Sequence, residues 1–168
     1  MFRIIENHPN DSRVRFSEND TVQTLSGRMG TGGGNVPMVL KGGDLMDEVS
    51  TVVRRLTPLE CERLQGYPDG WTDIGEWIDS KGKKHKDADS PRYKALGNSI
   101  ALPFWEWMAE RMTKVLNDDG IEKPKMASLF DGIGGFPLVY SRCGVDPIWA
   151  SEIEEFPIAV TKKQFGKE

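Results

Sequence analysis

The chain has 168 residues, of which 38% are hydrophobic and 29% charged, a composition typical of a soluble globular protein with one domain or one and a half. Its net charge of −4 and the lack of a long basic run disfavour a free-standing DNA-binding tail. No apolar stretch reaches membrane-spanning length, and the charged start Met1–Glu6 is unlike a signal peptide, so we expect a cytoplasmic protein.

The first forty residues carry turn-forming residues between short apolar runs, which predicts strands rather than helices. The expected strands are Phe2–Ile5, Arg13–Phe16, Thr21–Leu25 and Val36–Leu40. The glycine-rich stretch Ser26–Asn35 has two interpretations. It is either a solvated hairpin loop or a loop that contacts a ligand, with Arg28 reaching a phosphate or a base edge.

The sequence predicts a helix start directly after a polar connection that leads to Val52–Arg55. Thr57 as N-cap, Pro58 at the first helical position and Glu60 at the third predict a helix that ends at Gly66. A compact aromatic turn, 67–71, follows.

The next segment contains a small basic cluster, Lys81–Lys86, which is either a solvated loop or a contact to a phosphate backbone. From Ser99 an amphipathic helix is expected to run to about Leu116, with Pro103 in its first turn. Its apolar stripe favours core packing over a binding role. By composition, Asn117–Lys125 is a linker.

The last part of the chain has the pattern of a nucleotide-type cofactor pocket. The apolar run Met126–Phe130 predicts a strand, three glycines within 132–135 predict a tight turn, and Phe136–Tyr140 predicts a helix. A second apolar run, Pro147–Ala150, predicts the neighbouring strand. Glu152, twenty positions after Gly132, stands at the end of this run, where such folds hold ribose hydroxyls. A second helix is expected from about residue 154 to Gly166.

Other cofactor and metal chemistries fit less well. Pro137 stands where the third glycine of a nicotinamide-dinucleotide pattern belongs, which disfavours such an enzyme. His8 and His85 stand alone in polar surroundings, and Cys61 and Cys143 are too far apart to form a metal-ligand pair. No metal site is predicted, and Cys61 is expected to be a small buried apolar residue.

Four segments resemble conserved blocks of the DNA cytosine-5 methyltransferases. Arg55–Asp69 resembles the ninth block, Tyr93–Ile100 the tenth, Ser128–Gly135 the first and Ala150–Glu154 the second. Thr24–Leu25 and the glycine-rich loop after it resemble the later part of the target recognition domain. The usual order runs from block one to block ten, so the resemblance implies a circular permutation, in which 117–125 joins the natural termini.

The resemblance implies an α/β fold: a partial Rossmann-like, S-adenosylmethionine-dependent methyltransferase fold with a small β-rich piece of the recognition domain. The expected parts are a partial recognition domain at 1–50, blocks nine and ten at 51–116, the linker at 117–125, and the first βαβα portion of the cofactor-binding domain at 126–168.

Roles carry over from the family where residues match. The residues implied to bind S-adenosylmethionine are Phe130, Gly132, Ile133, Gly134, Gly135, Glu152, Ile153, Asn98 and Ser99. For Asn98 and Ser99, helix capping is an alternative that is compatible with this role. The residues implied to face double-stranded DNA, chiefly through phosphates, are Arg13, Thr24, Ser26 and Arg28.

The nucleophile of the family does not carry over. That cysteine attacks carbon 6 of a flipped-out cytosine from within a Pro-Cys dipeptide. Cys61 follows Glu60 and Cys143 follows Arg142, so no catalytic residue is expected in this chain. The family's Glu-Asn-Val and Gln-x-Arg blocks are also absent from the sequence.

Two functions therefore remain open. The chain is a portion of a bacterial or phage restriction-modification methyltransferase that is inactive alone, with blocks three to eight in a missing segment or a second polypeptide. Alternatively, it is an inactive remnant or a regulatory module that binds DNA or a partner. The strand Met126–Phe130 has one expected neighbour, so its open edge predicts self-association or an obligate partner.

Overall fold

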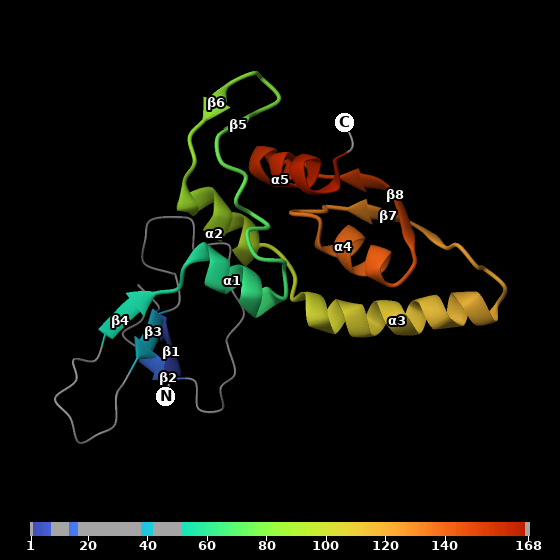
Figure 1. Ribbon diagram of the computed structural model, residues 1–168, viewed down its shortest axis with the longest axis horizontal. Helices are drawn as coiled ribbons and strands as arrows, with labels where there is room; N and C mark the ends of the chain where they lie inside the picture. Colours follow the sequence, from blue (N-terminus) through green and yellow to red (C-terminus); the bar gives the residue numbers. More distant parts are fainter. Residues whose placement is uncertain (1, 8–13, 17–37, 42–51, 167–168) are drawn as a thin grey trace. The chain divides into compact units, whose positions relative to one another are not determined.

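The computed structural model of the chain describes residues 2–7, 14–16, 38–41 and 52–166 (Figure 1). These residues form a mixed α/β structure, which confirms the predicted class at that level. The chain divides into two compact units. The first comprises residues 1–61 and 89–98, and the second comprises 62–88 and 99–168.

An antiparallel sheet in the order β2-β1-β3-β4 dominates the first unit. Its strands are β1 (Phe2–Asn7), β2 (Val14–Phe16), β3 (Met38–Lys41) and β4 (Val52–Arg55). Three of the four predicted strands are confirmed, and the fourth, Thr21–Leu25, lies outside the described residues. Val52–Arg55, which the sequence analysis placed at the end of a polar connection, form strand β4. Its two valines, which favour the extended backbone, pair with Leu40 and Lys41 of β3.

Helix α1 (Pro58–Gln65) begins as the sequence predicts. The Glu60 N–H donates to Thr57 Oγ1 at 3.2 Å, and the Thr57 N–H donates to Glu60 Oε2 at 2.8 Å, which is a reciprocal capping box. Gly66, with φ +81°, follows the helix end. Cys61 is fully buried, as predicted.

The sequence did not predict helix α2 (Asp89–Gly97), although Asp89 and Pro91 in its first turn are compatible with a helix start there. Two of its residues, Ala95 and Leu96, are buried. Its Tyr93 hydroxyl donates to the Leu56 carbonyl at 2.6 Å, which ties α2 to the residues before α1.

A parallel βαβ element forms the centre of the second unit. Strand β7 (Lys125–Leu129) pairs with β8 (Asp146–Ser151), and helix α4 (Gly135–Arg142) connects them and contacts both. Helix α3 (Leu102–Asp118) runs beside α4, and α5 (Glu155–Phe165) follows β8 (Figure 1). All five elements were predicted, with boundaries shifted by a few residues.

Residues 77–85 form a hairpin, whereas the sequence predicted a loop there. Strand β5 (Trp77–Ile78) pairs with β6 (Lys84–His85), and the Trp77 and His85 rings stack at 4.1 Å between centroids. Phe156 of α5 also meets the Trp77 ring edge-on, at 5.6 Å between centroids. This aromatic packing explains why a lysine-rich segment still pairs as a hairpin.

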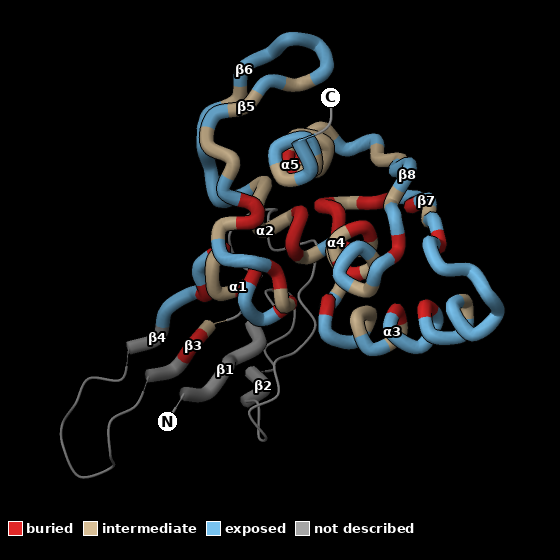
Figure 2. The backbone as a smooth tube through the Cα atoms, turned by 45° about the vertical axis from the view of Figure 1, so that its right-hand side comes forward, coloured by how far each residue is buried: buried red, intermediate tan, exposed pale blue. Residues whose placement is uncertain are grey.

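Buried residues of the second unit gather around α4 and the segment after α1 (Figure 2). Ile133, Val139 and Val160 are fully buried, and so is Ala109, on the face of α3 that also buries Leu102. Among the described residues, no helix combines the length and the apolar character needed to cross a bilayer.

Candidate functional site

The glycine turn at the carboxyl end of β7 is held in an uncommon backbone conformation. Phe130 has φ +53°, which L-residues other than glycine rarely adopt, and Gly132 and Gly134 have φ +59° and +82°. The Asp131 N–H donates to the Ser151 carbonyl at 2.9 Å, which joins the turn to the end of β8. A strained backbone of this kind at the end of parallel strands is a reason to expect a ligand there.

The Glu152 carboxylate accepts three backbone hydrogen bonds, one of them from the glycine turn. Gly132 N–H donates to Oε2 at 2.7 Å, and the N–H groups of Ile153 and Glu154 donate to Oε1 at 2.6 and 2.9 Å. Partial burial raises the pKa of the Glu152 carboxyl, but these bonds outweigh it, and the net pKa lies below its ordinary value. The carboxylate is therefore ionised at neutral pH, and Oε2 still has room to accept a hydroxyl.

Two large apolar side chains flank this carboxylate and face solvent. Phe130 is 84% exposed and Ile153 is 82% exposed. They are the two most exposed large apolar side chains among the described residues. Together with Glu152, they offer flat apolar contact beside a hydroxyl acceptor, which suits a nucleoside.

The three glycines of the turn have different surroundings, and so different reasons to lack a side chain. A Cβ at Gly132 would meet nothing within 4 Å, so its backbone faces open space. A Cβ at Gly134 would lie 2.5 Å from the ring of Phe165. A Cβ at Gly135 would lie 2.5 Å from the hydroxyl oxygen of Tyr67. Gly134 and Gly135 therefore permit close packing within the protein, and Gly132 is the one whose missing side chain leaves room for a ligand.

The aromatic turn 67–71 supports the glycine turn from behind. Trp71 Nε1–H donates to the Ile133 carbonyl at 2.8 Å, and the Tyr67 hydroxyl is hydrogen-bonded to Ser99. Gln164 Nε2–H donates to the Trp71 carbonyl at 2.7 Å, which adds α5 to the same cluster. Sequence reasoning identified the aromatic turn but missed this supporting role, because nothing in the local pattern tells which distant backbone an indole N–H will reach.

Ser99 and Asn98 differ in their surroundings. Ser99 lies in the second unit and is hydrogen-bonded to Tyr67. Asn98 belongs to the first unit, is exposed, and its N–H donates to the Lys94 carbonyl at 3.1 Å. The N-cap residue of α3 is Ala101, without a side-chain cap, so neither Asn98 nor Ser99 caps that helix.

Asp131, inside the glycine turn, is a second residue whose importance the sequence pattern did not reveal. Burial raises the pKa of its carboxyl, and the nearby Glu152 charge adds to this, although a hydrogen bond from Ser128 opposes them.

The Cys143 thiol, on the far end of α4, also has a pKa raised by burial, which makes it a poorer nucleophile.

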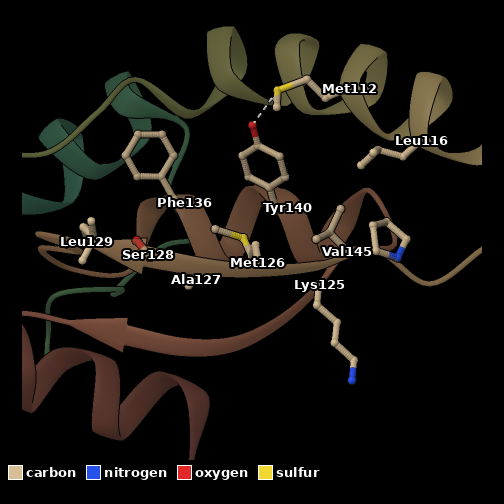
Figure 3. A pocket seen from close by; sticks show the side chains of 11 residues that line it. Met112, Leu116, Lys125, Met126, Ala127, Ser128, Leu129, Phe136, Tyr140 and Val145 are labelled. Atoms are coloured by element: carbon tan, nitrogen blue, oxygen red, sulfur yellow. Dashed lines mark hydrogen bonds between the residues drawn. The ribbon is translucent and has the colours of Figure 1, made fainter. Parts of the chain in front are cut away.

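Two grooves lie near the β7–β8 pair without including Gly132 or Glu152. One groove has a volume of about 430 Å³ and follows β7 between α3 and α4. In Figure 3, Met112 and Leu116 of α3 face Phe136 and Tyr140 of α4 across this groove. The other, of about 340 Å³, is lined by residues of α4, β8 and α5.

The residues implied to face DNA, Arg13, Thr24, Ser26 and Arg28, lie outside the described residues. Within the part of the chain that is described, no group of three or more His, Cys, Asp or Glu side chains is arranged to hold a metal ion.

Comparison with known proteins identifies the family. A match to the C-5 cytosine-specific DNA methylase family spans residues 5–114. The chain belongs to this family. A DNA N-6-adenine-methyltransferase of Escherichia phage P1 is 42% identical over 38% of this chain and 11% of its own length. The type II methyltransferases M.Bsp6I of Bacillus sp. (strain RFL6) and M.Sau3AI of Staphylococcus aureus are each 34% identical, over 60% and 40% of this chain.

This chain covers only 11%, 26% and 13% of the lengths of these three relatives. The matched region of the C-5 cytosine-specific DNA methylase family contains the segments that resemble blocks nine and ten, together with Ser99. The glycine turn and Glu152 lie beyond it. Their assignment therefore depends on the geometry of the turn and its neighbours.

Proposed function

We propose that this chain is a portion of a circularly permuted DNA (cytosine-5-)-methyltransferase and binds S-adenosylmethionine at the glycine turn. The observation that carries the proposal is a packing contact. Within one compact unit, Tyr67 of block nine, Trp71 just after it and Ile100 of block ten approach the turn that resembles block one, and Ser99 of block ten is hydrogen-bonded to Tyr67. The segments that resemble blocks nine, ten and one are therefore neighbours in the fold. This supports a circular permutation, in which the natural termini lie close together.

The residues of the site fit the cofactor. The ionised Glu152 would accept the ribose hydroxyls, Ile153 would lie against the adenine, and the open backbone at Gly132 would admit the methionine part. Phe130, Ile133, Gly134 and Gly135 would shape the turn around it, and Ser99 would supply a polar group. When bound, S-adenosylmethionine supplies an electrophilic methyl group. These residues bind and orient it.

The nucleophile would come from elsewhere. Cys61 is fully buried in the first unit, and burial raises the pKa of Cys143, so neither is suited to attack a base. We place the nucleophilic cysteine in sequence outside these 168 residues, on the same or a second polypeptide. Among the described strands, β7 pairs only with β8, and its other edge would receive a strand of that segment, beside the groove of Figure 3.

Double-stranded DNA is the proposed substrate, in keeping with the family, and a restriction-modification setting follows from the type II relatives. Arg13, Thr24, Ser26 and Arg28 are proposed to contact DNA, chiefly at phosphates. A regulatory module that binds DNA without methylating it is the alternative, favoured by the lack of a suitable cysteine.

The test is transfer of a labelled methyl group from S-adenosylmethionine to duplex DNA. The chain is assayed alone and mixed with a second polypeptide that carries the Pro-Cys, Glu-Asn-Val and Gln-x-Arg blocks, with a Cys→Ser version of that polypeptide as control. We expect transfer only in the mixture with the intact cysteine. Transfer by the chain alone would refute the placement of the nucleophile, and cofactor binding without transfer in every mixture would favour the regulatory module.

A further inference from the structure

The β5–β6 hairpin carries a concentrated positive charge on a chain whose net charge is −4. Four lysines, Lys81, Lys83, Lys84 and Lys86, fall within six residues, and all four are exposed. Figure 2 shows the tip of this hairpin exposed along its length. Among the described residues, no carboxylate forms an ion pair with these ammonium groups, although Lys81 is close enough to Glu155 to contribute to lowering its pKa.

The hairpin is built as an ordered element. Asp79 Oδ1 accepts the N–H groups of Lys81 and Lys83 at 3.0 and 2.9 Å, and Oδ2 lies 2.8 Å from His85 Nε2. The Gly82 N–H donates to the Asp79 carbonyl at 3.0 Å and closes the turn, where φ of +77° suits glycine. The lysines therefore project from a fixed turn, and less conformational entropy is lost when they bind an anion.

The hairpin is also fastened to the cofactor-binding portion. The Ser80 N–H donates to Glu155 Oε2 at 2.9 Å, the Ser80 hydroxyl bonds the other oxygen, and Trp77 packs on Phe156. Glu155 opens α5, three residues after Glu152. Asp79 and Glu155, two carboxylates that the hairpin contacts, thus both accept from N–H or O–H donors of the hairpin, and the ammonium groups stay available to an external anion.

We infer that the hairpin, through Lys81, Lys83, Lys84 and Lys86, binds the phosphate backbone of double-stranded DNA. The inference rests on the proposed DNA substrate and adds a contact that lies outside the recognition segment. A lysine is a point charge without base-specific geometry, so the contact is independent of sequence. Its place beside the start of α5 would hold the duplex against the portion of the protein that carries the methyl donor.

The experiment measures binding of a fluorescently labelled duplex of about 30 base pairs to the full 168-residue chain by anisotropy, between about 50 and 200 mM NaCl. The test variant changes all four hairpin lysines to glutamine. The matched control changes four exposed lysines outside the hairpin to glutamine, namely Lys114, Lys123, Lys125 and Lys162. Both variants lose the same net charge, so only the position differs.

We expect the hairpin variant to bind at least about tenfold more weakly at about 100 mM NaCl. Its plot of log affinity against log salt should be less steep by about 0.9 for each phosphate that is no longer neutralised, up to about 3.6. The control variant should retain the slope of the unmodified chain, and a variant with four arginines in the hairpin should restore it. Equal weakening in both glutamine variants, or no DNA binding by the unmodified chain, would overturn the inference.

Folding and cofactor binding are followed separately by circular dichroism and by titration with S-adenosylmethionine. Should the quadruple variant not fold, Lys84→Gln with Lys86→Gln alone changes exposed side chains and should lower the slope by up to about 1.8. An unchanged slope in that folded pair overturns the inference. Hairpin-dependent DNA binding without cofactor binding would instead refute the cofactor site and leave the hairpin inference standing.

Discussion

Replacing Gly132 by alanine separates the ligand-facing glycine from those that serve packing. With φ of +59°, Gly132 sits in the left-handed region, where an L-residue costs about 1–2 kcal/mol. No atom lies within 4 Å of the added methyl group, so we expect no further penalty from packing. The free energy of unfolding should therefore fall by about 1–2 kcal/mol, while affinity for S-adenosylmethionine should fall at least about tenfold because the methyl group occupies the ligand side.

Gly135→Ala should behave in the opposite way. Its methyl group would lie 2.5 Å from the Tyr67 hydroxyl oxygen and 2.9 Å from Ile100 Cγ1, so buried neighbours must move. Overpacking of this kind costs about 1–3 kcal/mol. The expected result is a loss of stability with a smaller effect on cofactor affinity.

Gly144→Ala is the matched control for Gly132→Ala. Gly144 has φ +85° and open space around it, but it precedes the amino end of β8, away from the candidate site. Urea denaturation should give Gly144→Ala and Gly132→Ala similar losses, and calorimetric titration with S-adenosylmethionine should distinguish them. If folded Gly132→Ala bound the cofactor as tightly as Gly144→Ala does, Gly132 would not line the ligand surface and the argument from open backbone would fail.

Three further results are expected. Trp71→Phe leaves the Ile133 carbonyl without its indole donor, which should cost about 1–3 kcal/mol in urea denaturation and weaken cofactor binding; an unchanged midpoint would contradict the supporting role. Thr57→Ala removes the cap of α1 and should cost about 1 kcal/mol, whereas Thr57→Ser should cost little. Because the folded pKa of Glu152 lies below its ordinary value of 4.5, cofactor affinity measured by calorimetry should not change from about pH 7 down to 4.5 and should fall only below it, unlike that of a carboxyl with a raised pKa.

Sequence patterns predicted the elements that local chemistry determines. The capping box at Thr57 and Glu60 needs only residues three apart, and the strand, glycine turn and helix from Lys125 to Arg142 follow from composition within a short window. Helix α2 was missed because its nine residues, Asp89–Gly97, carry no apolar stripe at helical spacing.

Contacts between distant segments were beyond such reasoning. The β5–β6 hairpin depends on stacking of Trp77 on His85 and on the edge-on contact of Trp77 with Phe156, which is seventy-nine positions further along the chain. In the same way, the resemblance named Gly134 and Gly135 as ligand-facing, but only three-dimensional packing reveals that Phe165 and Tyr67 approach them. A sequence pattern identifies a glycine that is needed, and the structure tells which neighbour requires it.

The most direct test of the cofactor site is calorimetric titration of S-adenosylmethionine into the 168-residue chain and into Glu152→Ala. Glu152 joins the glycine turn to the end of β8 and is the proposed acceptor for the ribose. The account predicts binding with one site per chain and a loss of at least about tenfold in affinity in folded Glu152→Ala. Equal affinity in the two proteins, or no binding by the unmodified chain, would contradict it.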